Sequence, residues 1–320
     1  MTAVLHAALR EDEIRRAVGL PRGGDAEVEG IATLAAPRDA CLHFVVRAAT
    51  PEAVRALTGL HGCIVLVPVG ANYAATLEQA QLIAVADPRA AMAEVLGFVR
   101  SEGRRTPWVI GSQFAADAEI SDKAVIGADV QIGPGAVIEP FATIGPDVSI
   151  GAGSVVRSGA RINPHVAIGE RTVIGNNAVI GSEGFGFVRD DAGDKVRIPH
   201  LGGIWIGSDV EIGALTVVQY GTITPTVIED LAKIDDNVEV AHNTHVGRNA
   251  SLVGGVVTGG SSVIGANAWI GINASIRNGR QVGAGALVGM DVSVQDDLPD
   301  RAAARAPRAD VRSRPRADPS

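Results

Sequence analysis

The chain has 320 residues, of which 46% are hydrophobic, only 3% are aromatic and 39 are glycine. This length allows two domains, and the shortage of aromatic side chains means that a large core must be built from Val, Ile, Leu and Ala. The net charge of −8 and the pI of about 5.4 argue against a bulk electrostatic preference for nucleic acid or for anionic membranes.

The N-terminal 105 residues are predicted to form a small α/β domain. Their apolar patterns predict helices over 8–18 and 88–100 and strands over 42–47, 63–69 and 82–86. Charged residues from Arg10 onward interrupt the N-terminus before an apolar segment develops, so neither a secretory signal nor a membrane-spanning helix is expected. Cys41 and Cys63 match no metal-ligand or redox spacing. We therefore expect a cytoplasmic protein without a bound metal.

From residue 120 onward an aliphatic residue recurs at every sixth position. The period holds without a miss from Ile120 to Ile180, and it returns after two interruptions as far as Val294, with one miss at Thr258. A period of six fits neither a helix nor a plain amphipathic strand and indicates a parallel β-helix. Each group of six residues, or hexad, supplies a short strand and a corner, and three hexads make a triangular coil that stacks about 4.8 Å above the last. We expect this β-helix to fill residues 106–299.

The segment 182–203, SEGFGFVRDDAGDKVRIPHLGG, breaks the period with two aromatic residues and several charges. Such a segment is typical of a loop that leaves a corner of the β-helix. A second and smaller interruption follows Val218, where the period slips by four residues before it resumes at Ile228. A purely structural prism is the alternative interpretation of the repeats, but an inert rod needs no such loop.

Four segments of the repeat region resemble the UDP-3-O-acylglucosamine N-acyltransferase family of lipid A biosynthesis. They are GSEGFGF at 181–187, VRIPHLGG at 196–203, IGSDVEIGA at 206–214 and KIDDNVEVAHNTHVG at 233–247. LHFVV at 42–46 in the N-terminal domain is similar as well. The resemblance implies a left-handed β-helix, a homotrimer with sites between neighbouring prisms, and transfer of a 3-hydroxyacyl chain to the amino group of a UDP-linked glucosamine derivative. It implies acyl carrier protein as the partner that brings the donor thioester, and no tightly bound cofactor.

His242, in the Ala-His-Asn triplet, is the candidate general base that the resemblance implies. The attack of an amine on a thioester requires the removal of a proton, and imidazole has the unperturbed pKa nearest to neutral pH. A carboxylate would orient the ring, and Asp236 and Glu239 are the candidates. The resemblance also places the counterpart of Asp236 in the site and gives the oxyanion-stabilising backbone N–H to Gly260. A structural role at a corner is the alternative interpretation of His242.

Six further residues are candidates for substrate binding: Phe185, Gly186 and His200 in the loop, Asn243 beside the base, and Phe44 and Arg47 in the N-terminal domain. In the family, two N-terminal aromatic residues with an asparagine between them hold uracil. Phe44 matches the first aromatic residue, whereas Arg47 stands in place of the asparagine, where an arginine could pair with a phosphate. Phe185 and the neighbouring Phe187 could instead serve only to anchor the loop.

Two departures from the family pattern lie in the repeat region. The usual second histidine downstream of the base is absent, with Gly279 or Arg280 in its place, and Gln219-Tyr220-Gly221 replaces an Asp-Arg-Gly triplet. The alternatives to the lipid A reaction are therefore acetyl or short-acyl transfer from coenzyme A to another nucleotide amino sugar, and a non-catalytic scaffold. The tail at 300–320, in which residues 301–320 hold six arginines against two aspartates, is expected to be disordered and to meet an acidic carrier protein.

Overall fold

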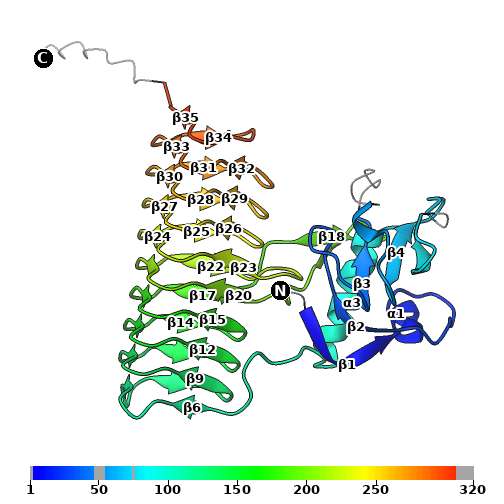
Figure 1. The fold of residues 1–320 in the computed structure, drawn as a ribbon, viewed down its shortest axis with the longest axis horizontal. Helices are drawn as coiled ribbons and strands as arrows, with labels where there is room; N and C mark the ends of the chain where they lie inside the picture. The colour runs from blue at the N-terminus through cyan, green and yellow to red at the C-terminus, as the bar shows by residue number, and fades with distance from the viewer. Residues whose placement is uncertain (1–2, 47–54, 74–75, 308–320) are drawn as a thin grey trace, which may run out of the picture.

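The computed structural model describes residues 3–46, 55–73 and 76–307 of the chain. It has two parts, a small N-terminal α/β unit and a tall prism of stacked coils that stands beside it (Figure 1). The chain enters the prism at one end and climbs coil by coil to the C-terminal end, so that position along the sequence is also height in the prism.

The α/β unit contains a five-stranded sheet in the order β1-β2-β3-β4-β5, in which only the β1–β2 pair is antiparallel. The strands and the two labelled helices are β1 (Ala3–Arg10), α1 (Glu11–Ala17), β2 (Glu27–Ile31), β3 (Cys41–Phe44), β4 (Ile64–Pro68), β5 (Gln81–Val85) and α3 (Pro88–Ser101). Helix α3 begins with Pro88 after Asp87, whose carboxylate accepts the N–H of Arg89. Buried aliphatic side chains of α3, among them Leu96, pack on the sheet beside Leu42 and Leu66.

Most of the elements expected in this unit are present near their predicted positions, but the first is different. The helix expected over 8–18 begins only at Glu11, and residues 3–10 form the unpredicted strand β1. Leu5 and Leu9 of that strand are buried, and their spacing of four fits one face of a helix as well as one face of a strand. Pairing with β2 decides between the two.

The prism has three parallel sheets, and each coil passes through sheets I, II and III in turn. Sheet I contains β6 (Gln113–Phe114), β9 (Val130–Ile132), β12 (Val148–Ile150), β15 (Val166–Ile168), β20 (Ile204–Ile206), β23 (Thr226–Ile228), β26 (His245–Val246), β29 (Val263–Ile264) and β32 (Gln281–Val282). Sheet II contains β7 (Glu119–Ile120), β10 (Val137–Ile138), β13 (Val155–Val156), β16 (Val173–Ile174), β21 (Glu211–Ile212), β24 (Lys233–Ile234), β27 (Ser251–Leu252), β30 (Trp269–Ile270), β33 (Leu287–Val288) and β35 (Ala303–Ala304). Sheet III contains β8 (Val125–Ile126), β11 (Thr143–Ile144), β14 (Arg161–Ile162), β17 (Val179–Ser182), β22 (Val217–Gln219), β25 (Glu239–Val240), β28 (Val257–Thr258), β31 (Ser275–Ile276) and β34 (Ser293–Val294). The predicted class, a mainly β parallel β-helix of hexapeptide repeats with a small α/β unit, is confirmed.

The periodic aliphatic residues of the hexads point into the prism and form its core. Ile144 is 1% exposed, and it stacks between Ile126 and Ile162 of the neighbouring coils. Thr258, the one miss in the period, also points inward, and its hydroxyl accepts the N–H of Ala241 at 2.9 Å. Many corners hold a residue with positive φ, and asparagine is frequent there because it tolerates that conformation: Asn177, Asn237, Asn243, Asn249, Asn267 and Asn273.

The two interruptions of the period are insertions at one corner of the prism. A regular coil takes 18 residues, as from Ile150 to Ile168, whereas the next coil on sheet I runs from Ile168 to Ile206 and the one after it from Ile206 to Ile228. Both insertions lie where the chain passes from sheet III to sheet I. We call this the domain-side corner, because it faces the α/β unit (Figure 1). Its residues in successive coils are 145–147, 163–165, 183–203, 220–225, 241–244, 259–262 and 277–280.

The C-terminal boundary of the prism corrects the expectation that the coils end at residue 299. Strand β35 (Ala303–Ala304) pairs with β33, and Ala304 takes the half-buried inward position. An alanine side chain is enough to continue the stack at its open end, so the low aliphatic content of this segment did not reveal the strand. The remainder of the expected tail, residues 308–320, lies outside the described residues.

Candidate active site

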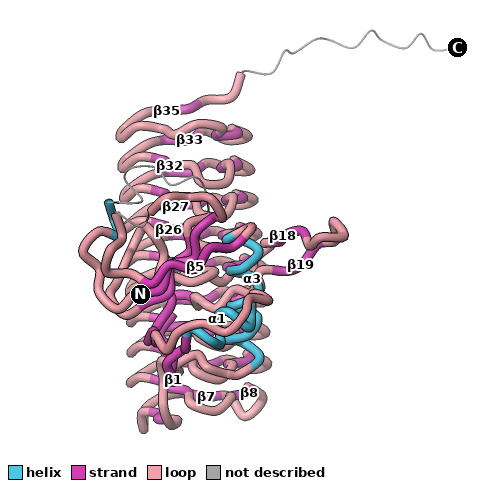
Figure 2. The backbone as a smooth tube through the Cα atoms, turned by 90° about the vertical axis from the view of Figure 1, so that its right-hand side faces the viewer, coloured by secondary structure: helices cyan, strands magenta, loops and turns pink. Residues whose placement is uncertain are grey.

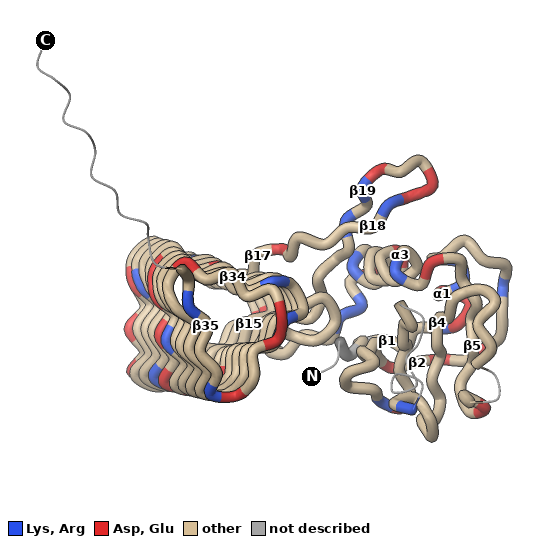
Figure 3. The backbone as a smooth tube through the Cα atoms, turned by 90° about the horizontal axis from the view of Figure 1, so that it is seen from above, with Lys and Arg blue, Asp and Glu red and all other residues tan. Residues whose placement is uncertain are grey.

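The large insertion connects the prism to the α/β unit. Residues 183–203 leave β17, form the antiparallel hairpin of β18 (Phe187–Arg189) and β19 (Lys195–Arg197), and return to β20. Seen from above, this loop crosses from the domain-side corner to α3 (Figure 3), and its hairpin projects beyond the prism (Figure 2). Ile198 and Leu201 of the loop are buried in the core of the α/β unit. The loop is therefore a packed bridge between the two parts.

His242 lies directly above the two insertions, in the domain-side corner between β25 and β26. Its ring is half-buried, and its Nδ1 is 3.1 Å from Oδ1 of Asn243. The same Oδ1 accepts the backbone N–H of Thr222 at 3.2 Å and its hydroxyl at 2.8 Å. Because a backbone N–H can only donate, the atom that faces Nδ1 is the amide oxygen. The neutral ring therefore carries its proton on Nδ1 and has a free lone pair on Nε2.

Gly260 lies against that free nitrogen in the next coil. A Cβ at this position would come within 2.3 Å of His242 Nε2, so the ring fills the space that a side chain would need. Among the described residues, none accepts a hydrogen bond from the backbone N–H of Gly260. The free Nε2 of His242 and the Gly260 backbone thus lie close together at this corner, and the roles predicted for the two residues stay predictions.

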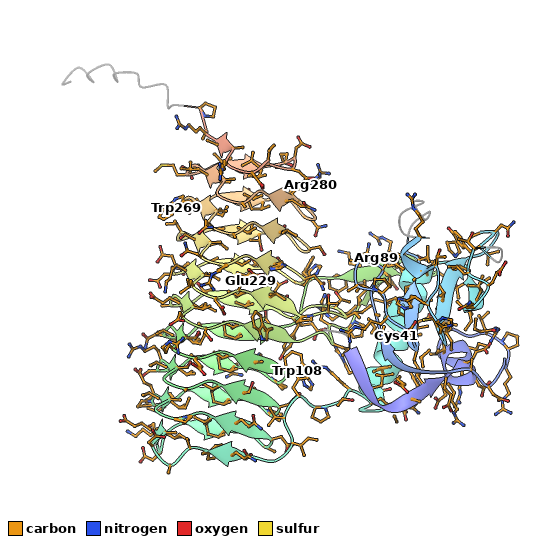
Figure 4. All side chains as sticks on the ribbon, viewed as in Figure 1. Cys41, Arg89, Trp108, Glu229, Trp269 and Arg280 are labelled. Carbon is orange, nitrogen blue, oxygen red and sulfur yellow. The ribbon has the colours of Figure 1, made fainter. Side chains whose placement is uncertain are left out.

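The surroundings of His242 favour its neutral form. Burial lowers its pKa below the usual value, the nearby charges of His200 and Arg89 act in the same direction, and the hydrogen bond with Asn243 raises the pKa. Arg89 reaches the site from α3, on the side of the α/β unit that faces the prism (Figure 4). A ring with this lowered pKa can accept a proton at neutral pH.

A second imidazole stands beside the first. The rings of His200 and His242 have their centroids 5.0 Å apart and their planes at 64°. The backbone N–H of His200 donates to Oε1 of Glu183 at 2.9 Å, and the same carboxylate pairs with Arg100 of α3 at 2.7 Å. His200 is therefore brought to His242 by a loop that α3 holds in place, whereas its predicted contact with substrate stays a prediction.

The carboxylates expected beside His242 do not contact its ring. Asp236 lies at a different corner, between sheets II and III, where its Oδ1 accepts the N–H of Ala214 at 2.6 Å. Glu239 is linked to His242 only through Gln219. Its carboxylate accepts from Gln219 Nε2 at 2.8 Å, and Gln219 Oε1 accepts the backbone N–H of His242 at 3.1 Å. A spacing of six residues moves the chain on by a whole corner. The neutral amide of Asn243 holds the ring instead.

Asp236 lines an open groove of about 700 Å³ on sheet II. The groove also contains Asp235, the Lys233–Glu211 ion pair and the exposed Trp269. Trp269 and Arg280, which belongs to the domain-side corner, lie on opposite sides of the prism (Figure 4). The groove and His242 thus belong to different faces of one chain.

The structure corrects the role predicted for Phe44. Its side chain is 5% exposed and lies in the core of the α/β unit, packed with the aliphatic residues of β2, β3 and β4. It has no open face on which uracil could stack, because all four residues of β3 are buried. Arg47, the second N-terminal candidate, lies outside the described residues.

Phe185 lies on the surface, whereas Gly186 packs against another residue of the loop. Phe185 is 75% exposed, and its ring meets Phe187 edge-on with centroids 5.0 Å apart. Arg197 covers the Phe187 ring at 4.6 Å. Gly186 lies against His200, where a Cβ would come within 3.1 Å of the ring. Phe185 alone of this pair remains available to a ligand.

Sequence reasoning gave no role in the site to four residues that shape it, namely Thr222, Gln219, Glu183 and Arg100. The four-residue slip after Val218 was the available signal for the first two, since it marks the insertion from which Thr222 reaches Asn243. Within 3–46, 55–73 and 76–307, no cluster of three or more His, Cys, Asp or Glu side chains suits a metal ion. No helix in those ranges is both long and apolar enough to span a bilayer.

The fold and this corner define a hexapeptide-repeat β-helix with a histidine site. Comparison with known proteins points to transferases: residues 123–158 match the model of the bacterial transferase hexapeptide (six repeats). The chain is 51% identical over 69 residues to UDP-3-O-acylglucosamine N-acyltransferase of Burkholderia multivorans, which covers 19% of each protein. The corresponding enzyme of Coxiella burnetii is 48% identical over 63 residues, or 20% of this chain and 18% of the relative. The matched segments thus span about a fifth of the length of these curated relatives.

The solved structures include a UDP-N-acetylglucosamine O-acyltransferase from Moraxella catarrhalis. It matches with a TM-score of 0.46 and 24% identity, over 57% of this chain and 67% of that chain. A UDP-N-acetylglucosamine acyltransferase from Arabidopsis matches with a TM-score of 0.46 and 21% identity, over 59% and 69% of the two chains.

Proposed function

We propose that this protein is an N-acyltransferase that moves a 3-hydroxyacyl chain from a thioester donor to the amino group of a UDP-linked glucosamine derivative. One observation carries the proposal. His242 is half-buried, its Nδ1 proton is held by Asn243, and its free Nε2 lies against Gly260, whose N–H is unused among the described residues. The segment similarity to N-acyltransferases of this class supports the choice of reaction.

The reaction would follow from this geometry. The amine nitrogen attacks the thioester carbonyl carbon, and Nε2 of His242 takes the proton that the nitrogen loses. The N–H of Gly260 donates to the carbonyl oxygen as it becomes negative. The tetrahedral intermediate then expels the sulfur, the C–S bond breaks, and the imidazolium returns its proton to the thiolate. Asn243 accepts from Nδ1 throughout, and thereby stabilises the imidazolium while it exists.

We also propose a homotrimer as the active assembly. Within one chain, Asp236 and its groove lie on another face from His242, so one copy does not enclose a substrate between them. In a threefold arrangement the groove of one copy could face the domain-side corner of the next, and Asp236 would then reach the site from the neighbouring subunit. Phe185, exposed beside the loop, is the aromatic surface proposed to contact the acceptor.

Acyl carrier protein is the proposed donor partner, as acyl-phosphopantetheine thioester, and a cytoplasmic location remains part of the proposal. The basic tail is the proposed contact, since carrier proteins are acidic. Removing residues 308–320 should then raise KM for the carrier and leave the use of coenzyme A thioesters unchanged. An unchanged KM for the carrier would reject the tail as its contact.

A second candidate is short-acyl transfer from coenzyme A to another nucleotide amino sugar. The buried position of Phe44 favours it, because the α/β unit lacks the expected stacking surface for uracil. The experiment that separates the candidates is mass spectrometry of products from acyl carrier protein and coenzyme A thioesters, each offered with UDP- and dTDP-linked amino sugars. The first candidate predicts a 3-hydroxyacyl amide from the carrier donor. Turnover only with short-acyl coenzyme A would select the second, and no turnover with any donor would reject both.

A further inference from the structure

We propose that His200 is a positioning residue for His242, and that the contacts from Arg100 through Glu183 to His200 connect the N-terminal α/β unit to the base. This inference deepens the proposed function and rests on it for the role of His242 in catalysis. The contacts themselves belong to three separate parts of the chain: α3, the start of the large insertion, and its end.

The loop confines the His200 ring closely. The side chain is 1% exposed. A Cβ on Gly184 would come within 2.4 Å of its Nε2, and one on Gly186 within 3.1 Å of its Cε1. A side chain on Gly184 would therefore displace the ring, and one on Gly186 would leave it little room. The ring lies edge-on to His242.

The carboxylate of Glu183 lies near the buried Nδ1 of His200. Nδ1 of His200 is buried without a hydrogen-bond partner among the described residues, and the nearest carboxylate oxygen, Oε1 of Glu183, is 3.6 Å away. A buried nitrogen of this kind is costly unless a charge compensates it. Glu183 supplies that charge, since Arg100 and His200 together hold its pKa down at about 2 despite its burial. The carboxylate is thus ionised at any working pH.

The His200 ring also affects the pKa of His242. A positive charge on the His200 ring opposes protonation of the neighbouring imidazole. The other charged groups that face the pair are Arg89 and Arg100 from α3, Glu183 and Arg197 from the loop, and Glu239, which reaches the base only through Gln219. His200 is the one that touches the base itself, so a change in the loop or in α3 is transmitted to the base through this ring.

The test is His200→Gln in the full-length protein, with Lys195→Gln in the exposed hairpin as the matched loop control. Histidine labelled with ¹³C and ¹⁵N allows the titration of each imidazole to be followed by NMR without any substrate, and a His242→Gln variant assigns the base. The proposal expects the pKa of His242 to rise in His200→Gln, and the acidic limb of kcat/KM to move to higher pH with it. The control should change neither. An unmoved titration of His242 would overturn the proposal, even if the protein were shown to be an acyltransferase.

A second variant guards against loss of folding in the first. Glu183→Gln keeps the imidazole and the shape of its support but removes the carboxylate. The proposal expects kcat to fall several-fold with KM for both substrates unchanged, because only the orientation of the base is affected. An unchanged kcat would contradict it. The NMR titration needs no turnover, so failure of this inference can be told from failure of the proposed function.

Discussion

The coils below residue 181 and the coils between residues 181 and 262 are built from the same hexads but use their domain-side corner differently. In the lower coils this corner holds His165, which pairs with the carboxylate of Asp147. The other oxygen of Asp147 accepts the N–H of Val109 at 2.6 Å, so this histidine helps to fasten the connector that leaves the α/β unit. In the upper coils His242 occupies the same corner, where Asn243 replaces the carboxylate.

His165 and His242 differ in the group that bonds to the ring, and this group decides whether the ring is suited to be a base. The carboxylate partner of His165 also accepts from the connector, and this arrangement suits an anchor. An amide partner fixes the tautomer of His242 without stabilising its cation as strongly, and leaves Nε2 as a base. The two insertions are the other difference between the upper and lower coils. They bring Thr222 to Asn243 and His200 to His242, and a regular coil of three hexads has no residues that could make these contacts.

The largest expected effect lies in the lower coils and concerns stability. Ile144→Ala should lower the free energy of unfolding by about 2–5 kcal/mol, because it opens a cavity in a stack where each coil is held by its neighbours. Denaturant unfolding would measure the loss. Activity of the folded variant should equal that of the wild type, and a large fall in kcat would mean that the lower coils also contribute to the site.

The next effect lies in the upper coils and concerns activity. Gly260→Ala would drive a methyl group into the space of His242 Nε2, so the ring must move. A displacement of about 1 Å can cost roughly a hundredfold in rate, and a loss of that size in kcat is expected. The matched control is Gly97→Ala in α3, where a Cβ would meet nothing within 4 Å. Equal activities of the two variants would remove Gly260 from the site.

A smaller effect is expected from Asn243→Ala. The Asn243 hydrogen bond raises the pKa of His242, so its loss should lower that pKa and move the acidic limb of kcat/KM to lower pH. The ring of His242 is then neutral over a wider pH range, but it is a weaker base and is less well oriented. Its transition state should lose about 0.5–1.5 kcal/mol, or roughly twofold to tenfold in kcat. A limb that moves to higher pH would contradict the assigned hydrogen bond.

The smallest effect is expected from Phe44→Leu in the α/β unit. A buried apolar exchange of this kind should cost less than about 1.5 kcal/mol in stability and leave KM for the nucleotide sugar unchanged. Thermal unfolding and steady-state kinetics would check the two statements. A several-fold rise in KM with a folded protein would restore Phe44 to substrate binding.

The sequence predicted the prism well because its signal is repeated: each hexad states again which residue faces inward. The loop and the Ala-His-Asn corner stood out as departures from that repeat. The partners of His242 did not, since Thr222, Glu183 and Arg100 come from other coils or from α3 and share no local spacing with it. Asp236 does not lie beside His242 within one chain for a related reason, because six residues along the chain is a third of a turn around the prism.

The α/β unit had no repeat to guide its prediction, and there tertiary pairing decided. Residues 3–10 became a strand because β2 offers a partner, and Phe44 became a core residue because β3 is covered on both faces. Neither fact can be read from residue types alone.

The most direct test of the account is the rate of acyl transfer by His242→Ala beside that of His245→Ala. His245 lies three residues away on β26 and is half-buried, and among the described residues its side chain bonds only to Glu229, at 2.8 Å. The account predicts that His242→Ala lowers kcat by about 10²–10⁴ while its unfolding transition stays that of the wild type, and that His245→Ala retains full activity. A His242→Ala protein that turns over at the wild-type rate would contradict the assignment of the base.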